Sequence, residues 1–149
     1  MASLSSIGLM MKNSTALSVI ACLFMALVSF GAMGQIPQTQ RSNDLAFITG
    51  GIGDDEYQAI EAESKRWPIM LQFSKLEPNG RGEWVSEVQV SILNTNKMEV
   101  FRAISNGPLM LIDLRPGTYQ LITSYDDSVQ KRLIVIESQH SKKLSISWK

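Results

Sequence analysis

The amino-acid sequence predicts an all-β protein, a seven-stranded antiparallel β-sandwich preceded by one N-terminal helix. The first observation is alternation: Val88, Val90 and Ile92 are separated by polar residues, which is the period of a strand with one buried face. The second is spacing, because such runs recur about every 8–12 residues, with turn-forming residues between them. The third is that no helical segment separates these runs, so parallel connections are not expected.

The start of the chain has the features of a cleavable secretory signal, which we assign to residues 1–34. Lys12 precedes an uncharged apolar run, residues 16–30, and the small-x-small site Ala32-Met33-Gly34 follows it. This order of a basic residue, an apolar core and a small-residue site is what a translocon and its peptidase require. We therefore expect a processed chain that begins at Gln35 and works in the periplasm of a cell with two membranes.

Other interpretations of this segment have less support. A retained transmembrane anchor would need about 20 apolar residues, more than this run offers. A lipoprotein would need Cys22 at the cleavage point, but this cysteine lies inside the apolar run. The start of translation stays open between Met1 and Met11, because Met11 with the lysine after it resembles a natural signal start more closely.

Processing at this site determines the composition of the mature chain. It would leave 149 − 34 = 115 residues, enough for one domain with a real core. All 14 acidic residues but only 13 of the 14 basic ones follow residue 34, so the net charge is near −1. No basic stripe is present to attract nucleic acid. The only cysteine leaves with the signal, so no disulfide is expected.

We divide the mature chain into a polar tether (35–43), an N-terminal segment with the helix (44–67) and the sandwich (68–149). The helix is expected from Asp54 to Arg66, with Asp54 as its cap, acidic residues in its first turn and basic ones in its last. Tyr57 and Ile60 share one face of it, and Pro68 ends it. In the sandwich, the continuous apolar runs 109–112 and 133–136 predict strands that are covered on both faces or lie at the centre.

One short motif points to a known family. In Leu114-Arg115-Pro116-Gly117-Thr118-Tyr119, Pro116 presets φ, and Gly117 supplies a turn conformation that other residues resist. The Leu-x-Pro-Gly-x-Tyr pattern resembles carboxypeptidase regulatory-like domains, which are transthyretin-like sandwiches, and the likeness runs from about residue 69 to 148. The ring of Tyr119 is expected to pack inward while its hydroxyl bonds to nearby backbone, as in a tyrosine corner.

The segment before the sandwich extends the resemblance. Gly50-Gly51-Ile52-Gly53 followed by an acidic helix start and Trp67-Pro68 resembles small exported proteobacterial proteins that carry this domain alone. The resemblance implies a fold and a compartment, but it says little about activity. Transthyretin-like hydrolases that open hydroxyisourate are similar in fold, but they use several histidines and a C-terminal Tyr-Arg-Gly-Ser, whereas this chain has only His140 and ends in Ser147-Trp148-Lys149.

The residues Gly50, Gly51, Gly53, Asp54, Asp55 and Glu56 invite several functional interpretations. They do not match a phosphate-binding loop, and the acids would repel an anion at the helix start. Three adjacent acids also lack the alternating ligands of a calcium loop. We interpret the segment as a turn that feeds a helix, with exposure to a partner protein or peptide as its functional alternative.

The tryptophans are the other candidates for contact. Trp148 continues the inward face of the last strand, and Trp67 is expected to pack the helix onto the sandwich. Trp84 follows a glycine-rich loop and is the best single candidate for an exposed contact with a partner.

Nothing in the sequence predicts catalysis. A zinc site needs several His or Cys ligands, and His140 is expected to be a solvated loop residue. We therefore expect no enzyme activity, no metal and no cofactor, and a binding, accessory or structural module whose partner is another periplasmic or envelope protein. Two alternatives stay open: a small hydrolase-like enzyme that uses the acids of 50–56 with His140 or Glu99, and a sandwich that self-associates edge to edge.

Overall fold

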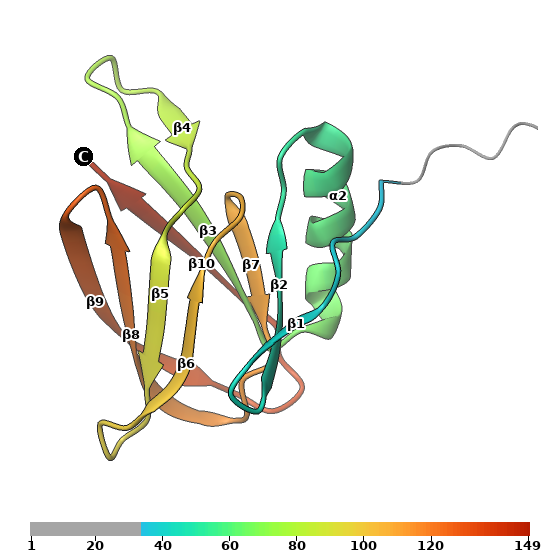
Figure 1. The fold of residues 1–149 in the computed structure, drawn as a ribbon, viewed down its shortest axis with the longest axis vertical. Coiled ribbons are helices and arrows are strands. Elements are labelled where there is room, and N and C mark those ends of the chain that lie inside the picture. The colour runs from blue at the N-terminus through green and yellow to red at the C-terminus, as the bar shows by residue number, and fades with distance from the viewer. Residues whose placement is uncertain (1–33) are drawn as a thin grey trace, which may run out of the picture. The chain divides into compact units, whose positions relative to one another are not determined.

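A computed structural model describes residues 34–149, which form two β-sheets and one helix (Figure 1). Residues 1–33 of the expected signal lie outside these residues. The larger sheet has six strands and the smaller has four, so the described chain has ten strands rather than about seven. The strands are β1 (Gln40–Ser42), β2 (Leu45–Gly50), β3 (Ile69–Leu76), β4 (Gly82–Trp84), β5 (Gln89–Leu93), β6 (Glu99–Ile104), β7 (Leu109–Ile112), β8 (Gly117–Tyr125), β9 (Ser128–Ile136) and β10 (Lys142–Trp148).

The expectation of a purely antiparallel sandwich is wrong at one pair of strands. The larger sheet has the order β1-β2-β7-β3-β10, with β4 added to β3, and the smaller has the order β6-β5-β8-β9. All ladders are antiparallel except β3 with β10, which run parallel from Lys142 opposite Ile69 to Trp148 opposite Lys75. This parallel pair needs no crossover helix, because the chain between β3 and β10 forms all four strands of the smaller sheet.

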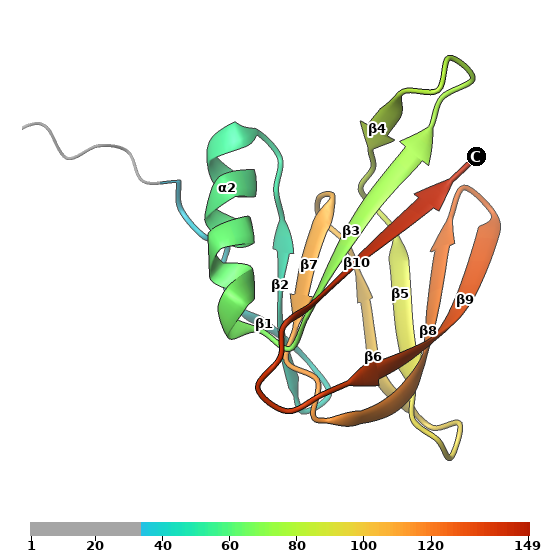
Figure 2. The ribbon, with the colours of Figure 1, turned by 180° about the vertical axis from the view of Figure 1, so that it is seen from behind.

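The molecule has three layers, because α2 (Asp54–Glu63) covers the outer face of the larger sheet (Figures 1 and 2). The main core lies between the sheets and includes Phe73, Phe101 and Ile112, all fully buried. A second, smaller cluster lies under the helix, where Ile60 packs on Ile48, Met70, Leu109 and Leu111. Among the described residues, no helix is long and apolar enough to cross a membrane.

The cap of the helix lies one residue earlier than the sequence predicts. Gly53, rather than Asp54, occupies the cap position, and Asp54, Asp55 and Glu56 fill the first turn. No side chain caps the helix, since Gly53 has none, and the acids stabilise the positive end of the helix dipole instead. A 3₁₀ turn over Ser64–Arg66 completes the expected segment, and Tyr57 and Trp67 pack against the cluster beneath the helix as predicted.

Two boundaries differ from those expected. Residues 40–42, placed in the polar tether, pair with β2 as β1, and Ser42 and Asn43 hydrogen-bond to β6. The strand β2, placed before the sandwich, pairs with β7 in the larger sheet. The polar segment β1 joins the sheet through backbone and short polar side chains, which hydropathy does not reveal. The sheet therefore draws on residues well before Pro68.

Of the two continuous apolar runs, one behaves as predicted. Every residue of β7 is buried, since the helix covers one face and the smaller sheet the other. The run 133–136 in β9 differs: Leu133 is 77% exposed and Val135 is 46% exposed. The reason is position, because β9 is an edge strand of the smaller sheet and only its Ile134 and Ile136 face the core.

The Pro-Gly-x-Tyr motif forms a tyrosine corner at the start of β8. Gly117 has φ of 155°, a conformation that side chains resist. The Tyr119 hydroxyl donates a 2.9 Å hydrogen bond to the backbone oxygen of Arg115, and its ring packs against the main core. The bond ties the β7–β8 loop to the strand that follows it.

Side chains close both open sides of the sandwich. On one side, Gln130 and Arg132 of β9 donate to the backbone oxygens of Ser147 and Ser145 in β10, at 2.7 and 3.0 Å. In return, Lys142 and Trp148 of β10 donate to backbone oxygens of Val135 and Ser128. We call these four bonds the β9–β10 seam.

The opposite side has a smaller seam of the same kind. The Ser42 hydroxyl accepts from the Arg102 N–H and donates to the Arg102 oxygen, while Asn43 donates to the Val100 oxygen. Side chains of β1 and its turn thus occupy backbone groups at the edge of β6. Occupied edge groups are poorly available to a second chain, which counts against self-association through these edges.

Candidate functional site

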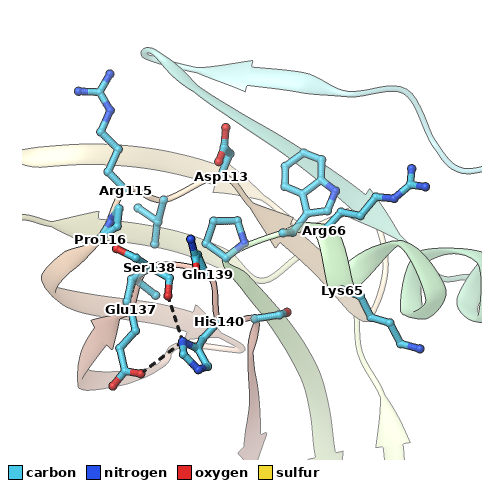
Figure 3. Close-up of a pocket in the computed structure, with 14 residues that line it drawn as sticks. Lys65, Arg66, Asp113, Arg115, Pro116, Glu137, Ser138, Gln139 and His140 are labelled. Atoms are coloured by element: carbon cyan, nitrogen blue, oxygen red, sulfur yellow. Dashed lines mark hydrogen bonds and ion pairs between the residues drawn. The ribbon is translucent and has the colours of Figure 1, made fainter.

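A group of polar and charged side chains lies at the end of the sandwich where the helix meets β3 (Figure 3). A cavity of about 370 Å³ lies there between three segments, residues 65–68, 113–116 and 136–141. It is lined by His140, the histidine that the hydrolase-like alternative would use. Catalysis here would require the charged groups around His140 to converge on one reacting position.

They do not converge on a reacting position. Figure 3 shows Lys65, Arg66 and Arg115 extending outward in different directions. The Nδ1 atom of His140 lies 3.0 Å from the Ser138 backbone oxygen and 3.9 Å from the Glu137 carboxylate, and 75% of its side chain is exposed. His140 is thus the solvated loop residue expected from the sequence. Among the described residues, no group of His, Cys, Asp and Glu has the arrangement of a metal site.

The second cavity, about 480 Å³, contains Glu99. Its carboxylate accepts hydrogen bonds from Arg102 at 2.6 and 2.9 Å and from Ser91 at 2.8 Å. The Arg102 hydrogen bonds, followed by that of Ser91, lower the pKa of Glu99 to about 2. A carboxylate held ionised in this way is suited to structure rather than to proton transfer.

The acids at the helix start share neither cavity with His140 or Glu99. Asp54 and Asp55 are exposed, while Glu56 turns back and accepts a 2.6 Å hydrogen bond from the Gly51 N–H. The arrangement expected for a hydrolase-like site, acids in a cleft with His140 or Glu99, is therefore not formed in the described chain.

The glycines of this segment differ in exposure. Gly50 and Gly51 are buried, and only Gly53 is open to solvent. A Cβ on Gly107 would fall 2.3 Å from the Gly50 oxygen, so the β6–β7 loop packs directly on the end of β2. The backbone at Gly50 and Gly51 thus serves close packing and is not presented to a partner.

The structure brings Trp84 beside the helix that follows this segment. Trp84 ends β4 and is 55% exposed. Its ring centroid lies 5.7 Å from that of Tyr57, one residue after Glu56 in the first turns of α2. Two of the segments singled out in the sequence, 30 residues apart, therefore meet on one surface, through a tyrosine for which we had predicted only a packing role.

A row of polar side chains continues this surface across the sheet. Trp84 lies opposite Ser74 of β3, which lies opposite Ser147 of β10, and the two serine hydroxyls are hydrogen-bonded at 2.6 Å. In the next row, Ser145 donates to Gln72, and Gln72 donates to the Tyr57 hydroxyl at 2.6 Å. We call the whole set the Trp84 surface: Tyr57, Gln72, Ser74, Trp84, Ser145 and Ser147, of which Gln72 is buried and supports the others.

Sequence reasoning missed the polar part of this surface. Its only signal was the outward positions of β3 and β10, where Gln72 and Ser74 alternate with Leu71 and Phe73, and Ser145 and Ser147 with Ile146. Small polar residues at outward positions are ordinary for a solvated strand. Only the parallel register of β3 and β10 places these four side chains next to one another.

Comparison with known proteins adds no assignment. No family model matches the chain, and no curated protein matches it with significance. The Trp84 surface and the two-sheet fold are therefore the features that bear on function.

Proposed function

We propose that this chain is an exported, non-catalytic binding module that holds a component of the cell envelope on its Trp84 surface. The observation that carries the proposal is the exposed ring of Trp84 packed on the half-buried ring of Tyr57, an aromatic surface fixed between a helix and a strand. Tyrosine and tryptophan are the residues that contribute most binding energy when a partner covers them. Neither cavity offers a convergent catalytic group to compete with this surface.

Two further parts of the proposal concern fold and compartment. The two-sheet arrangement and the corner formed by Pro116, Gly117 and Tyr119 support a transthyretin-like fold of the carboxypeptidase regulatory-like type. Setting aside the short additions β1 and β4 leaves eight strands, one more than the seven that this fold has in common. The order of basic residue, apolar run and small-x-small site supports cleavage after Gly34 and release to the periplasm.

The experiment uses the protein expressed from its full-length gene and recovered from the periplasmic fraction. Mass spectrometry of the intact chain is expected to give a start at Gln35. The same material is then sedimented with washed envelopes of its own cells. Wild type is expected to sediment, and Trp84→Ala to lose at least about tenfold in apparent affinity, as for a binding hot spot.

Leu133→Ala is the matched control, because Leu133 is the most exposed large apolar residue and lies on β9, in the other sheet. It should sediment like wild type. Sedimentation that ignores Trp84→Ala would overturn the assignment of the contact to this surface, and a start at Met1 or Met11 on periplasmic protein would overturn cleavage.

A further inference from the structure

We infer that the ligand of the Trp84 surface is an uncharged oligosaccharide chain. The inference rests on the proposed binding function and names the chemical class of its ligand. Three properties of the surface carry it: a flat aromatic face, a row of hydroxyl groups beside that face, and the absence of charge among its six side chains.

The aromatic face is held in place. Trp84 is anchored through the β4–β3 ladder, and its ring packs against Tyr57 with an interplanar angle of 35°. The Tyr57 hydroxyl is in turn fixed by the hydrogen bond from Gln72. One flat face of a pyranose ring consists of C–H groups, which stack on the electron-rich face of an indole. A fixed indole loses little conformational entropy when a sugar covers it.

The polar row has about the length of a short sugar chain. Trp84, Ser74 and Ser147 lie on three adjacent strands, and strands are about 4.8 Å apart, so the row spans roughly 10 Å. That is close to the length of a disaccharide. Each serine hydroxyl has one donor and two acceptor positions, and their mutual bond uses only part of this capacity. A sugar ring has the same mixture of donors and acceptors around its rim.

Charge selects among possible ligands. The nearest ion pair, Lys143 with Glu61 at 2.7 Å, lies at the border of the surface and is neutral as a pair. The six side chains of the Trp84 surface carry no charge at neutral pH. A strongly acidic or basic peptide would lose hydration there without meeting an opposite charge. An uncharged polar chain loses no charge hydration and matches the row in hydrogen bonding.

The test is titration of the protein, expressed from its full-length gene, with four hexasaccharides: cellohexaose, chitohexaose, maltohexaose and mannohexaose. Binding is followed by calorimetry and by tryptophan fluorescence. At least one of the four is expected to bind with a Kd below about 5 mM. Trp84→Ala should weaken that binding at least tenfold, and Ser74→Ala and Ser147→Ala should each weaken it about fivefold, the loss of one hydrogen bond.

The two serine variants keep the test valid if Trp84→Ala disturbs folding, because Ser147 is exposed and its removal leaves the strand ladder intact. Leu133→Ala is again the control and should bind as wild type does. Failure of all four sugars to bind would overturn the inference, as would binding that none of the three surface variants weakens.

The same data separate this inference from the proposed function. Sedimentation with envelopes that depends on Trp84, combined with no binding of any hexasaccharide, would leave the binding function standing and remove the oligosaccharide. Saturable binding of hexalysine or hexaglutamate that Trp84→Ala abolishes would likewise assign the surface to a charged peptide and overturn the inference.

Discussion

At the scale of single residues, the tyrosine corner and the proposed binding surface use different side chains. The pair Pro116-Gly117 and the ring of Tyr119 organise a loop and contact the core, while Trp84 faces solvent. The sequence could distinguish the residues of the tyrosine corner from Trp84, because a turn motif predicts its own backbone geometry. It could not find Tyr57 as the neighbour of Trp84, since helix periodicity reports only that a residue lies on the buried face.

Gly117→Val tests the tyrosine corner. A β-branched residue at φ of 155° is strained, so we expect a loss of about 2–3 kcal/mol in the free energy of unfolding. Urea denaturation measures it. Gly82→Val serves as the control, because a Cβ at Gly82 meets nothing within 4 Å and is expected to cost much less. Equal midpoints for the two variants would contradict the placement of this turn.

Glu99 gives the protein a predictable response to acid. Its pKa of about 2, against an ordinary 4.5, means that the folded state favours the ionised form. Its stabilising contribution is therefore complete above about pH 4.5 and is lost as the pH falls toward 2. The difference in Tm between wild type and Glu99→Gln should be largest at neutral pH and shrink across this window. Glu83→Gln on β4 provides the baseline, and a difference that grows on acidification would refute the assignment.

At the scale of elements, the predictions that held came from patterns with a local cause. The helix over residues 54–66 has its acids, its buried face and Pro68 in sequence order, and the structure differs in the identity of the cap and in a last turn, Ser64–Arg66, that is 3₁₀. The apolar run of β9 misled because hydropathy does not report whether a strand lies at an edge. Edge position depends on which strands pair, and that is decided far away in the sequence.

The β9–β10 seam predicts what happens when an edge is opened. In the double variant Gln130→Ala, Arg132→Ala, the backbone oxygens of Ser145 and Ser147 lose their side-chain donors. We expect a loss of about 1–2 kcal/mol in stability and association that increases with protein concentration. Light scattering measures the association. Lys131→Ala, a change between the two positions, should stay monomeric like wild type, and a monomeric double variant would show that the seam does not guard this edge.

At the scale of the whole molecule, the sequence predicted a two-sheet β-protein with one helix but not the way its strands connect. Turn residues and alternation identified most of the runs that became strands. The parallel pairing of β3 with β10 could not be foreseen, because 65 residues separate Leu76 from Lys142 and no local signal links them. The Trp84 surface depends on that pairing, so the site was no more predictable than the topology.

The same pairing has a consequence for the timing of folding. β3 lies inside the larger sheet, yet its longest ladder is with β10, the last strand of the described chain. Contacts between segments so distant in sequence form late and slowly. The larger sheet stays incomplete until residues 142–148 have emerged, so the growing chain is kept open for longer. For a protein that we propose crosses a membrane as a thread, this delay preserves the one state in which passage is possible.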